Sequence, residues 1–149
     1  MITLPAGPRV RRRVRARGEH GRAGRSTATH PGSSTGSTTY APLPGSAGPS
    51  ATVTVPASGV VLVSVTSQMQ GNANSTSCLM SFAATGVTAS DATAVILAGA
   101  AIQRATATAV LTGLTPGVSN TFTALYRNQG TGSTQCTYAN RSIFAIPLP

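Results

Sequence analysis

Apolar and polar residues alternate along most of the chain after residue 40, as they do in strands that bury one face. Val61, Val63 and Val65 share one face of the segment 60–68, and alanines alternate with threonines in 103–112. The threonines favour a strand there over the helix that alanine alone would permit. The pattern predicts about eight strands, at residues 51–56, 60–68, 77–84, 94–97, 103–112, 121–128, 135–138 and 142–147.

Turn residues separate these segments at the spacing of about 8 to 12 residues that is typical of sandwiches and barrels. Residues 56–59 (Pro-Ala-Ser-Gly) predict a turn that joins the first two strands as a pair, and the last two strands are predicted to pair as well. Within 89–101 we expect one helical turn, opened by Ser90 or Asp91 as its cap. The expected fold is all-β, an antiparallel β-sandwich resembling a jelly roll.

Residues 1–36 differ from the rest in composition. Eight of the eleven arginines lie before Ser26, among prolines, glycines and serines that bury little apolar surface. We therefore expect a disordered basic tail and linker at 1–36, followed by one β-sandwich domain at 37–149. The arginines are either a solvated arm or a contact to nucleic acid or another anionic surface through counterion release, and we expect no nucleic-acid binding elsewhere.

The start of the chain has no apolar stretch of the kind that a secretory signal peptide needs. No apolar run approaches the roughly 20 residues that span a bilayer, so we expect no membrane insertion.

Acid–base side chains are scarce in the expected domain. After residue 30 there is no His, Lys or Glu, and Asp91 is the single carboxylate side chain. Paired-carboxylate hydrolysis, a base-activated Ser or Thr nucleophile and a multi-ligand metal site each need groups that are missing. The chain also has no glycine-rich phosphate-binding motif. We expect a protein without a cofactor that is not an enzyme, with Asp91 as a turn or cap residue.

Two cysteines, Cys78 and Cys136, each lie in a predicted strand. They can form a disulfide bond that closes a long loop, or they can be two buried thiols. The sequence leaves both alternatives open.

The candidate ligand contacts are two tyrosines and two arginines. Tyr126 and Tyr138, like Tyr40, can present a ring to a sugar face or pack in a half-buried position. Arg127 and Arg141, together with Arg104, can decorate a rim that contacts an anionic surface polymer, or can protect edge strands from aggregation.

A resemblance to known domains adds an expectation about function. Residues 113–117 (Gly-Leu-Thr-Pro-Gly) with the strand that follows them are similar, loosely, to fibronectin type III modules. A closer resemblance is to the small C-terminal β-sandwich domains of tail-fibre and minor tail proteins of phages that infect high-GC actinobacteria. The segments that carry it are Thr38-Thr39-Tyr40, Gly48-Pro49, Cys78 to Phe82, Ala89 to Ala92, Leu111 to Gly117, Asn140 to Ile143 and Ile146 to Leu148.

This resemblance implies a particle-surface module without catalytic residues, often trimeric, that contacts the host envelope. We therefore expect a homo-oligomer, with a trimer favoured, at the surface of a virion or tail-like particle, and a host surface polysaccharide as a candidate partner. The alternative is a stand-alone fibronectin-like or lectin-like domain that binds a surface glycan.

Overall fold

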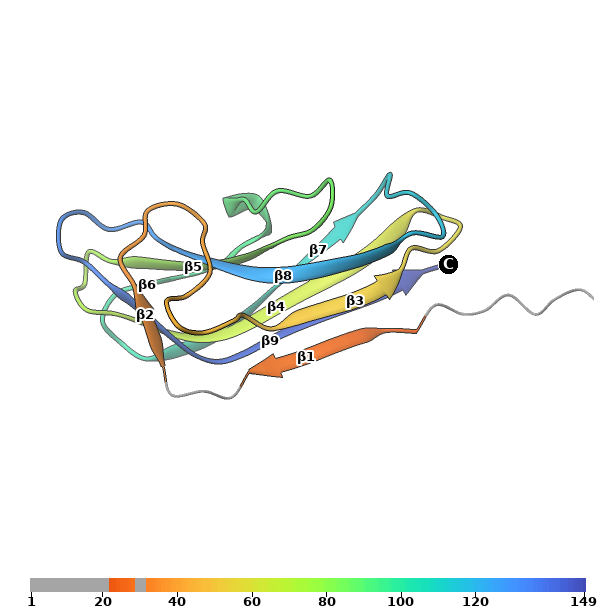
Figure 1. Cartoon of the computed structure of the whole chain (residues 1–149). Helices are drawn as coiled ribbons and strands as arrows, with labels where there is room; N and C mark the ends of the chain where they lie inside the picture. Colours follow the sequence, from red (N-terminus) through yellow and green to blue (C-terminus); the bar gives the residue numbers. More distant parts are fainter. Residues whose placement is uncertain (1–21, 29–31) are drawn as a thin grey trace, which may run out of the picture.

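The computed structural model describes residues 22–28 and 32–149, which form two antiparallel sheets packed face to face (Figure 1). The strands and one short 3-10 helix are, in chain order, β1 (Gly24–Ala28), β2 (Ser33–Thr35), β3 (Ser50–Thr54), β4 (Val60–Gly71), β5 (Ser77–Ala83), η1 (Asp91–Thr93), β6 (Val95–Ala98), β7 (Gln103–Leu111), β8 (Ser119–Asn128) and β9 (Cys136–Leu148).

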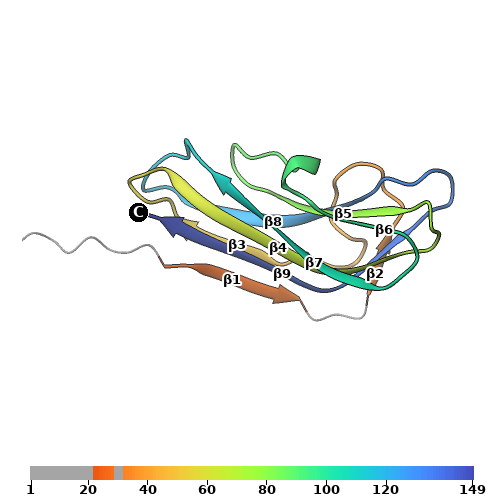
Figure 2. The same cartoon turned by 180° about the vertical axis from the view of Figure 1, so that it is seen from behind.

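The larger sheet has the strand order β1-β9-β4-β7, with β2 also pairing with β9, and the smaller sheet has the order β3-β8-β5-β6. Figure 2 shows the same two layers from behind. The predicted antiparallel β-sandwich is confirmed. The predicted helical turn is η1, which starts at Asp91 and follows Ser90, although the Ser90 side chain makes no capping hydrogen bond.

The core lies between the sheets and follows from the alternation of side chains along each strand. Val61, Val63 and Val65 of β4 point inward from the larger sheet and are fully buried. Phe82 and Phe122 point inward from the smaller sheet, with ring centroids 5.9 Å apart in an edge-to-face arrangement.

The first two predicted strands do not pair with each other, so that prediction is wrong. The turn at 56–59 forms, with the Gly59 amide donating to the Pro56 carbonyl at 2.9 Å, but it carries the chain from one sheet to the other. β3 pairs with β8, whereas β4 pairs with β7 and β9. Alternation shows which face of a strand is buried, and in a sandwich both sheets bury one face against the same core.

The predicted strands at 135–138 and 142–147 are one continuous strand, β9, rather than a pair. The residues between them form an irregularity: Asn140 has a positive φ of 47°, and the register with β4 shifts between Thr66 and Gln68. Asn tolerates the left-handed conformation that such a bulge requires. The polar break in the sequence therefore marks a bulge and not a turn.

Two short strands lie before residue 37, where a disordered tail was expected. β1 pairs with residues 141–145 of β9, and β2 pairs with residues 136–138. The prediction is wrong for these two strands, because backbone hydrogen bonds to a sheet edge do not require apolar side chains. The rest of the prediction concerns residues 1–21 and 29–31, which lie outside the described residues. Most of the arginine run lies there too.

Candidate functional site

Cys78 and Cys136 form a disulfide bond, which decides between the two alternatives left open by the sequence. Cys78 lies in β5 of the smaller sheet and Cys136 begins β9 of the larger sheet, with their Cα atoms 5.5 Å apart. Both side chains are buried. The bond ties the two sheets together, and it indicates an oxidising environment, because disulfides persist mainly in such settings.

Tyr126 and Tyr138 are fully buried, so neither can present a ring to a sugar, and that hypothesis is wrong for both. Their ring centroids lie 4.8 Å apart in an edge-to-face arrangement. The Tyr138 hydroxyl donates to the Arg127 carbonyl at 2.6 Å and accepts a hydrogen bond from the Leu79 amide at 3.2 Å. Burial raises the pKa of both phenols. The inward face of β8 and β9 requires these rings as core, with their hydroxyls satisfied internally.

Arg141 is a buried side chain and not a member of a surface rim, being only 1% exposed. Its guanidinium lies over the Tyr126 ring at 5.4 Å and donates to the Tyr126 hydroxyl at 3.3 Å and to Ser46 Oγ at 3.0 Å. Its Nε has no hydrogen-bond partner, and no carboxylate among residues 22–28 and 32–149 pairs with it. Arg141 therefore keeps a positive charge in the interior with only neutral partners.

Arg127 pairs with Asp91, the single carboxylate side chain of the described residues. Arg127 Nη2 donates to Asp91 Oδ2 at 2.5 Å, and the Tyr40 hydroxyl donates to Asp91 Oδ1 at 2.9 Å. Burial, followed by the hydrogen bond to Asp91, raises the pKa of Tyr40. These contacts join the loop before β3, the helix η1 and β8, so this cluster holds the outer side of the smaller sheet together.

Of the two interpretations of the three arginines, edge-strand protection is wrong for Arg127 and Arg141. Arg127 lies in β8 and Arg141 in β9, and both strands have neighbours on each side. Arg104 lies in β7, the last strand of the larger sheet, where edge protection remains a suitable interpretation for this residue alone. The residues singled out from the sequence serve mainly to hold the fold.

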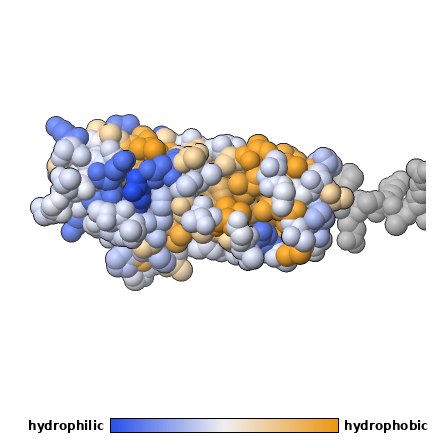
Figure 3. All heavy atoms as spheres, turned by 90° about the horizontal axis from the view of Figure 1, so that it is seen from above, coloured by the Kyte–Doolittle hydropathy of each residue, from blue (hydrophilic) through white to orange (hydrophobic). Residues whose placement is uncertain are grey.

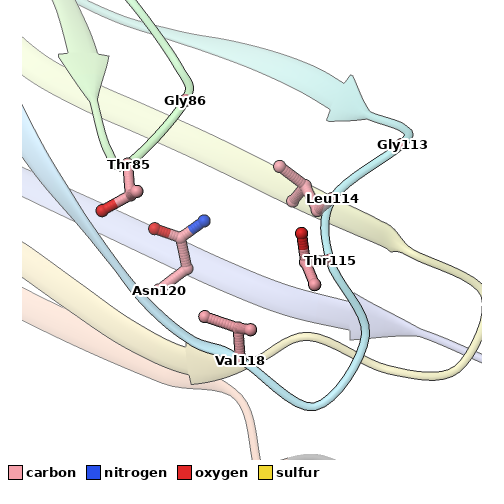
Figure 4. A pocket seen from close by; sticks show the side chains of 7 residues that line it. All are labelled: Thr85, Gly86, Gly113, Leu114, Thr115, Val118 and Asn120. Atoms are coloured by element: carbon pink, nitrogen blue, oxygen red, sulfur yellow. The ribbon is translucent and has the colours of Figure 1, made fainter.

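A residue that sequence analysis did not single out, Asn120, lies at the bottom of a hollow of about 210 Å³ at one end of the sandwich (Figure 4). We call it the Asn120 hollow. Asn120 is in β8, is 5% exposed, and its Oδ1 atom has no hydrogen-bond partner within the described part of the chain. Figure 4 shows its amide group between the loop of Thr85 and the loop of Leu114 and Thr115. The hollow is lined by Thr85, Gly86, Gly113, Leu114, Thr115, Val118 and Asn120.

Backbone hydrogen bonds hold both rims of the Asn120 hollow. Residues 85 and 86 are the centre of a tight turn closed by reciprocal bonds between Ala84 and Val87, each 3.0 Å long. On the other rim, the Leu114 amide donates to the Gly59 carbonyl at 3.1 Å and the Gly117 amide donates to the Val55 carbonyl at 2.9 Å. The hollow is thus built into the fold, as ligand sites usually are.

The lining of this hollow is uncharged. It combines threonine hydroxyls and the Asn120 amide with the apolar side chains of Leu114 and Val118. Such a surface suits a small neutral ligand with hydroxyl donors, because a buried carbonyl oxygen without a partner gains from each donor it meets. The sequence carried one signal for this site. Asn120 is polar, yet it lies on the same inward face of β8 as Phe122 and Ala124.

Hydrophobic residues gather in the right half of the face seen from above, and hydrophilic residues gather towards its left end (Figure 3). Exposed large apolar side chains include Ile96, Ile102, Val110, Val118 and Ile146. Of these, Val118 forms part of the wall of the Asn120 hollow.

Comparison of the chain with models of protein families and with curated proteins finds no match. Within residues 22–28 and 32–149, no helix is long and apolar enough to cross a membrane. In the same part of the chain, no three His, Cys, Asp or Glu side chains come together as ligands for a metal ion.

Proposed function

We propose that this domain is a non-enzymatic structural and adhesion module of phage or prophage origin, carried at the surface of a tail fibre or similar assembly and contacting the host envelope. The resemblance of residues 37–149 to actinobacterial phage tail domains supports this proposal. So does the disulfide between Cys78 and Cys136, which suits a particle outside the reducing cytoplasm.

A non-enzymatic role is supported by what the polar side chains do. The carboxylate of Asp91 is engaged by Arg127 and Tyr40, and the buried tyrosine hydroxyls bond to the backbone or to Arg141. The Asp91 carboxylate and these hydroxyls are thus engaged in contacts within the fold. They stabilise the sandwich.

The observation that carries the proposal is the Asn120 hollow. A buried amide oxygen without a partner costs stability, and a ligand that donates a hydrogen bond to it would recover that cost. A volume of about 210 Å³ suits one sugar ring rather than a drug-sized molecule. We propose that the hollow takes a neutral sugar unit of a host surface polysaccharide, which donates a hydroxyl hydrogen bond to Asn120 Oδ1.

Binding of the labelled full chain to actinobacterial cells and to an array of their envelope glycans tests this function. We expect binding that Asn120→Ala weakens about tenfold, the size expected for a buried hydrogen bond to a ligand. Asn74→Ala is the matched control, because it makes the same change at an exposed position outside the hollow. Equal binding by both variants would refute the hollow as the site, and no binding to any glycan or cell would refute adhesion.

The proposed assembly is a homotrimer. β7 ends the order of the larger sheet, and Val110 on it is exposed, as is Ile102 just before it. An apolar edge of this kind favours association. Light scattering should give the mass of a trimer at micromolar concentration, and a stable monomer would contradict it.

A stand-alone glycan-binding domain is the second candidate function. One observation favours it: backbone hydrogen bonds within this chain hold both rims of the Asn120 hollow, between Ala84 and Val87 on one side and from Leu114 to Gly59 on the other. A monomer that binds glycans through Asn120 would support this function over the fibre module. A trimer would favour the fibre module.

A further inference from the structure

Positive charge in the described residues is not balanced by negative side chains. Five arginines, at positions 22, 25, 104, 127 and 141, face one carboxylate side chain, that of Asp91. Asp91 is bound to Arg127, which leaves the other four without a carboxylate partner in the part of the chain that the structure describes.

Three of these four arginines line one hollow of about 150 Å³, which we call the arginine hollow. Arg25 comes from β1, Arg104 from β7 and Arg141 from β9, three strands of the larger sheet. Distant parts of the sequence therefore meet here. The remaining lining residues are polar: Thr27, Asn140 and Ser142.

Sheet register explains how this hollow forms. Thr27 of β1 lies opposite Ser142, and Arg104 of β7 lies opposite Gln68 of β4. Asn140, at the bulge of β9, donates a hydrogen bond from Nδ2 to Gln68 Oε1 at 2.8 Å. It therefore lies between Thr27 on β1 and Arg104 on β7. A bulge re-aims side chains, which here adds an amide to a surface that regular pleating would not provide.

Contacts within the fold position two of the arginines. The Arg25 guanidinium lies 4.9 Å from the centroid of the Phe144 ring, a cation–π contact that keeps this long side chain over the sheet. The Arg141 guanidinium is held in the interior by Tyr126 and Ser46, so the lining arginines that are exposed to a ligand are Arg25 and Arg104. Positioned guanidinium groups lose less entropy on binding than free ones, which favours recognition of an anion.

Electrostatics gives the reason for a ligand. Like charges repel, and buried charges in proteins are usually paired, yet here a buried arginine and two exposed ones share one hollow without a carboxylate. Edge protection accounts for one charge on β7, but not for this gathering from three strands. An anion in the hollow would meet the charges of Arg25 and Arg104, the two exposed arginines of the three.

We propose that the arginine hollow binds an acidic sugar unit of a polysaccharide, with its anionic oxygen atoms facing Arg25 and Arg104 and its hydroxyls facing Thr27, Asn140 and Ser142. The hollow is small and local, and no aromatic ring lines it as a stacking platform for bases, which favours a sugar over nucleic acid. The anionic oxygens can belong to a carboxylate or to a phosphate, because guanidinium groups bind both. The site shares no residue with the Asn120 hollow, so the two proposals fail independently.

The test is an NMR titration of the full ¹⁵N-labelled chain with a uronic acid oligosaccharide, with a phosphodiester-linked sugar oligomer and with inorganic phosphate. Saturable shifts are expected at the amides of Thr27, Asn140 and Ser142. Arg25→Gln and Arg104→Gln should each weaken binding about tenfold, as expected for loss of one charge-assisted hydrogen bond. Arg22→Gln is the matched control: it removes the same charge from an exposed arginine outside the hollow and should change affinity less than about twofold.

The uronate and phosphodiester arms identify which anionic group the site prefers, and saturable binding of either supports the proposal. Equal weakening by Arg22→Gln would overturn it, since the attraction would then come from net charge alone. So would the absence of shifts at the three amides, or tighter binding of a DNA oligonucleotide at these amides than of either sugar oligomer.

Discussion

Loss of the disulfide between Cys78 and Cys136 is expected to have the largest single effect on stability. The two residues are 58 positions apart, so the bond restricts a large part of the unfolded chain. The chain-entropy relation for a loop of that length gives about 4 kcal/mol at 25 °C. Small domains have only about 5 to 15 kcal/mol of stability in total. The reduced protein should therefore be folded only marginally.

Urea denaturation followed by far-ultraviolet circular dichroism measures this effect. At an m value of about 2 kcal/mol per molar, the midpoint should fall by about 2 M in the presence of a reductant. The double variant Cys78→Ala with Cys136→Ala should show the same low midpoint with or without reductant. It serves as the control for any other action of the reductant. The m value should rise on reduction, because the unfolded chain expands.

A midpoint shift below about 0.5 M, with an unchanged m value, would refute the reasoning. It would mean that the unfolded chain gains little freedom when the bond is absent. A large shift in the alanine variant, but none on reduction of the wild-type chain, would instead assign the effect to packing of the two side chains.

Three further predictions concern the polar contacts. Tyr138→Phe should lower the free energy of unfolding by about 1 to 3 kcal/mol in urea titrations, because the buried Leu79 amide loses its partner; no loss would contradict that assignment. Burial raises the pKa of Tyr126 and Tyr138, so the unfolded chain loses these phenol protons at a lower pH than the folded chain does. The melting temperature should therefore be constant to about pH 9 and should fall as the pH rises through 10. Ionisation seen at 295 nm in the folded state at pH 10 would refute it. Asp91→Asn should cost less than about 1 kcal/mol, because the ion pair with Arg127 is partly exposed, and a larger loss in thermal melts would contradict this estimate of its weight.

Strand periodicity was enough to predict the class of fold. The inward face of β4 could be read from Val61, Val63 and Val65, because a half-buried strand needs an apolar residue at every second position. The helical turn at Asp91 was predicted from capping residues in the same way. These features depend on interactions between near neighbours in the chain.

Pairing between strands could not be predicted in the same way. The turn at 56–59 suits a hairpin equally well as a crossing between sheets, since both place the flanking valines in the core. β1 and β2 had no apolar pattern to reveal them, because their backbone groups complete the edge of the larger sheet.

The functional candidates show the same division. That Cys78 and Cys136 could pair was visible in the sequence, but only the packing of β5 on β9 brings them together. Composition showed how few charges the domain has, yet the sheet order decides that Arg25, Arg104 and Arg141 line one hollow. Local residue preferences therefore determine the strands and their buried faces, whereas the sites depend on contacts between strands far apart in sequence, which form only when the two sheets pack.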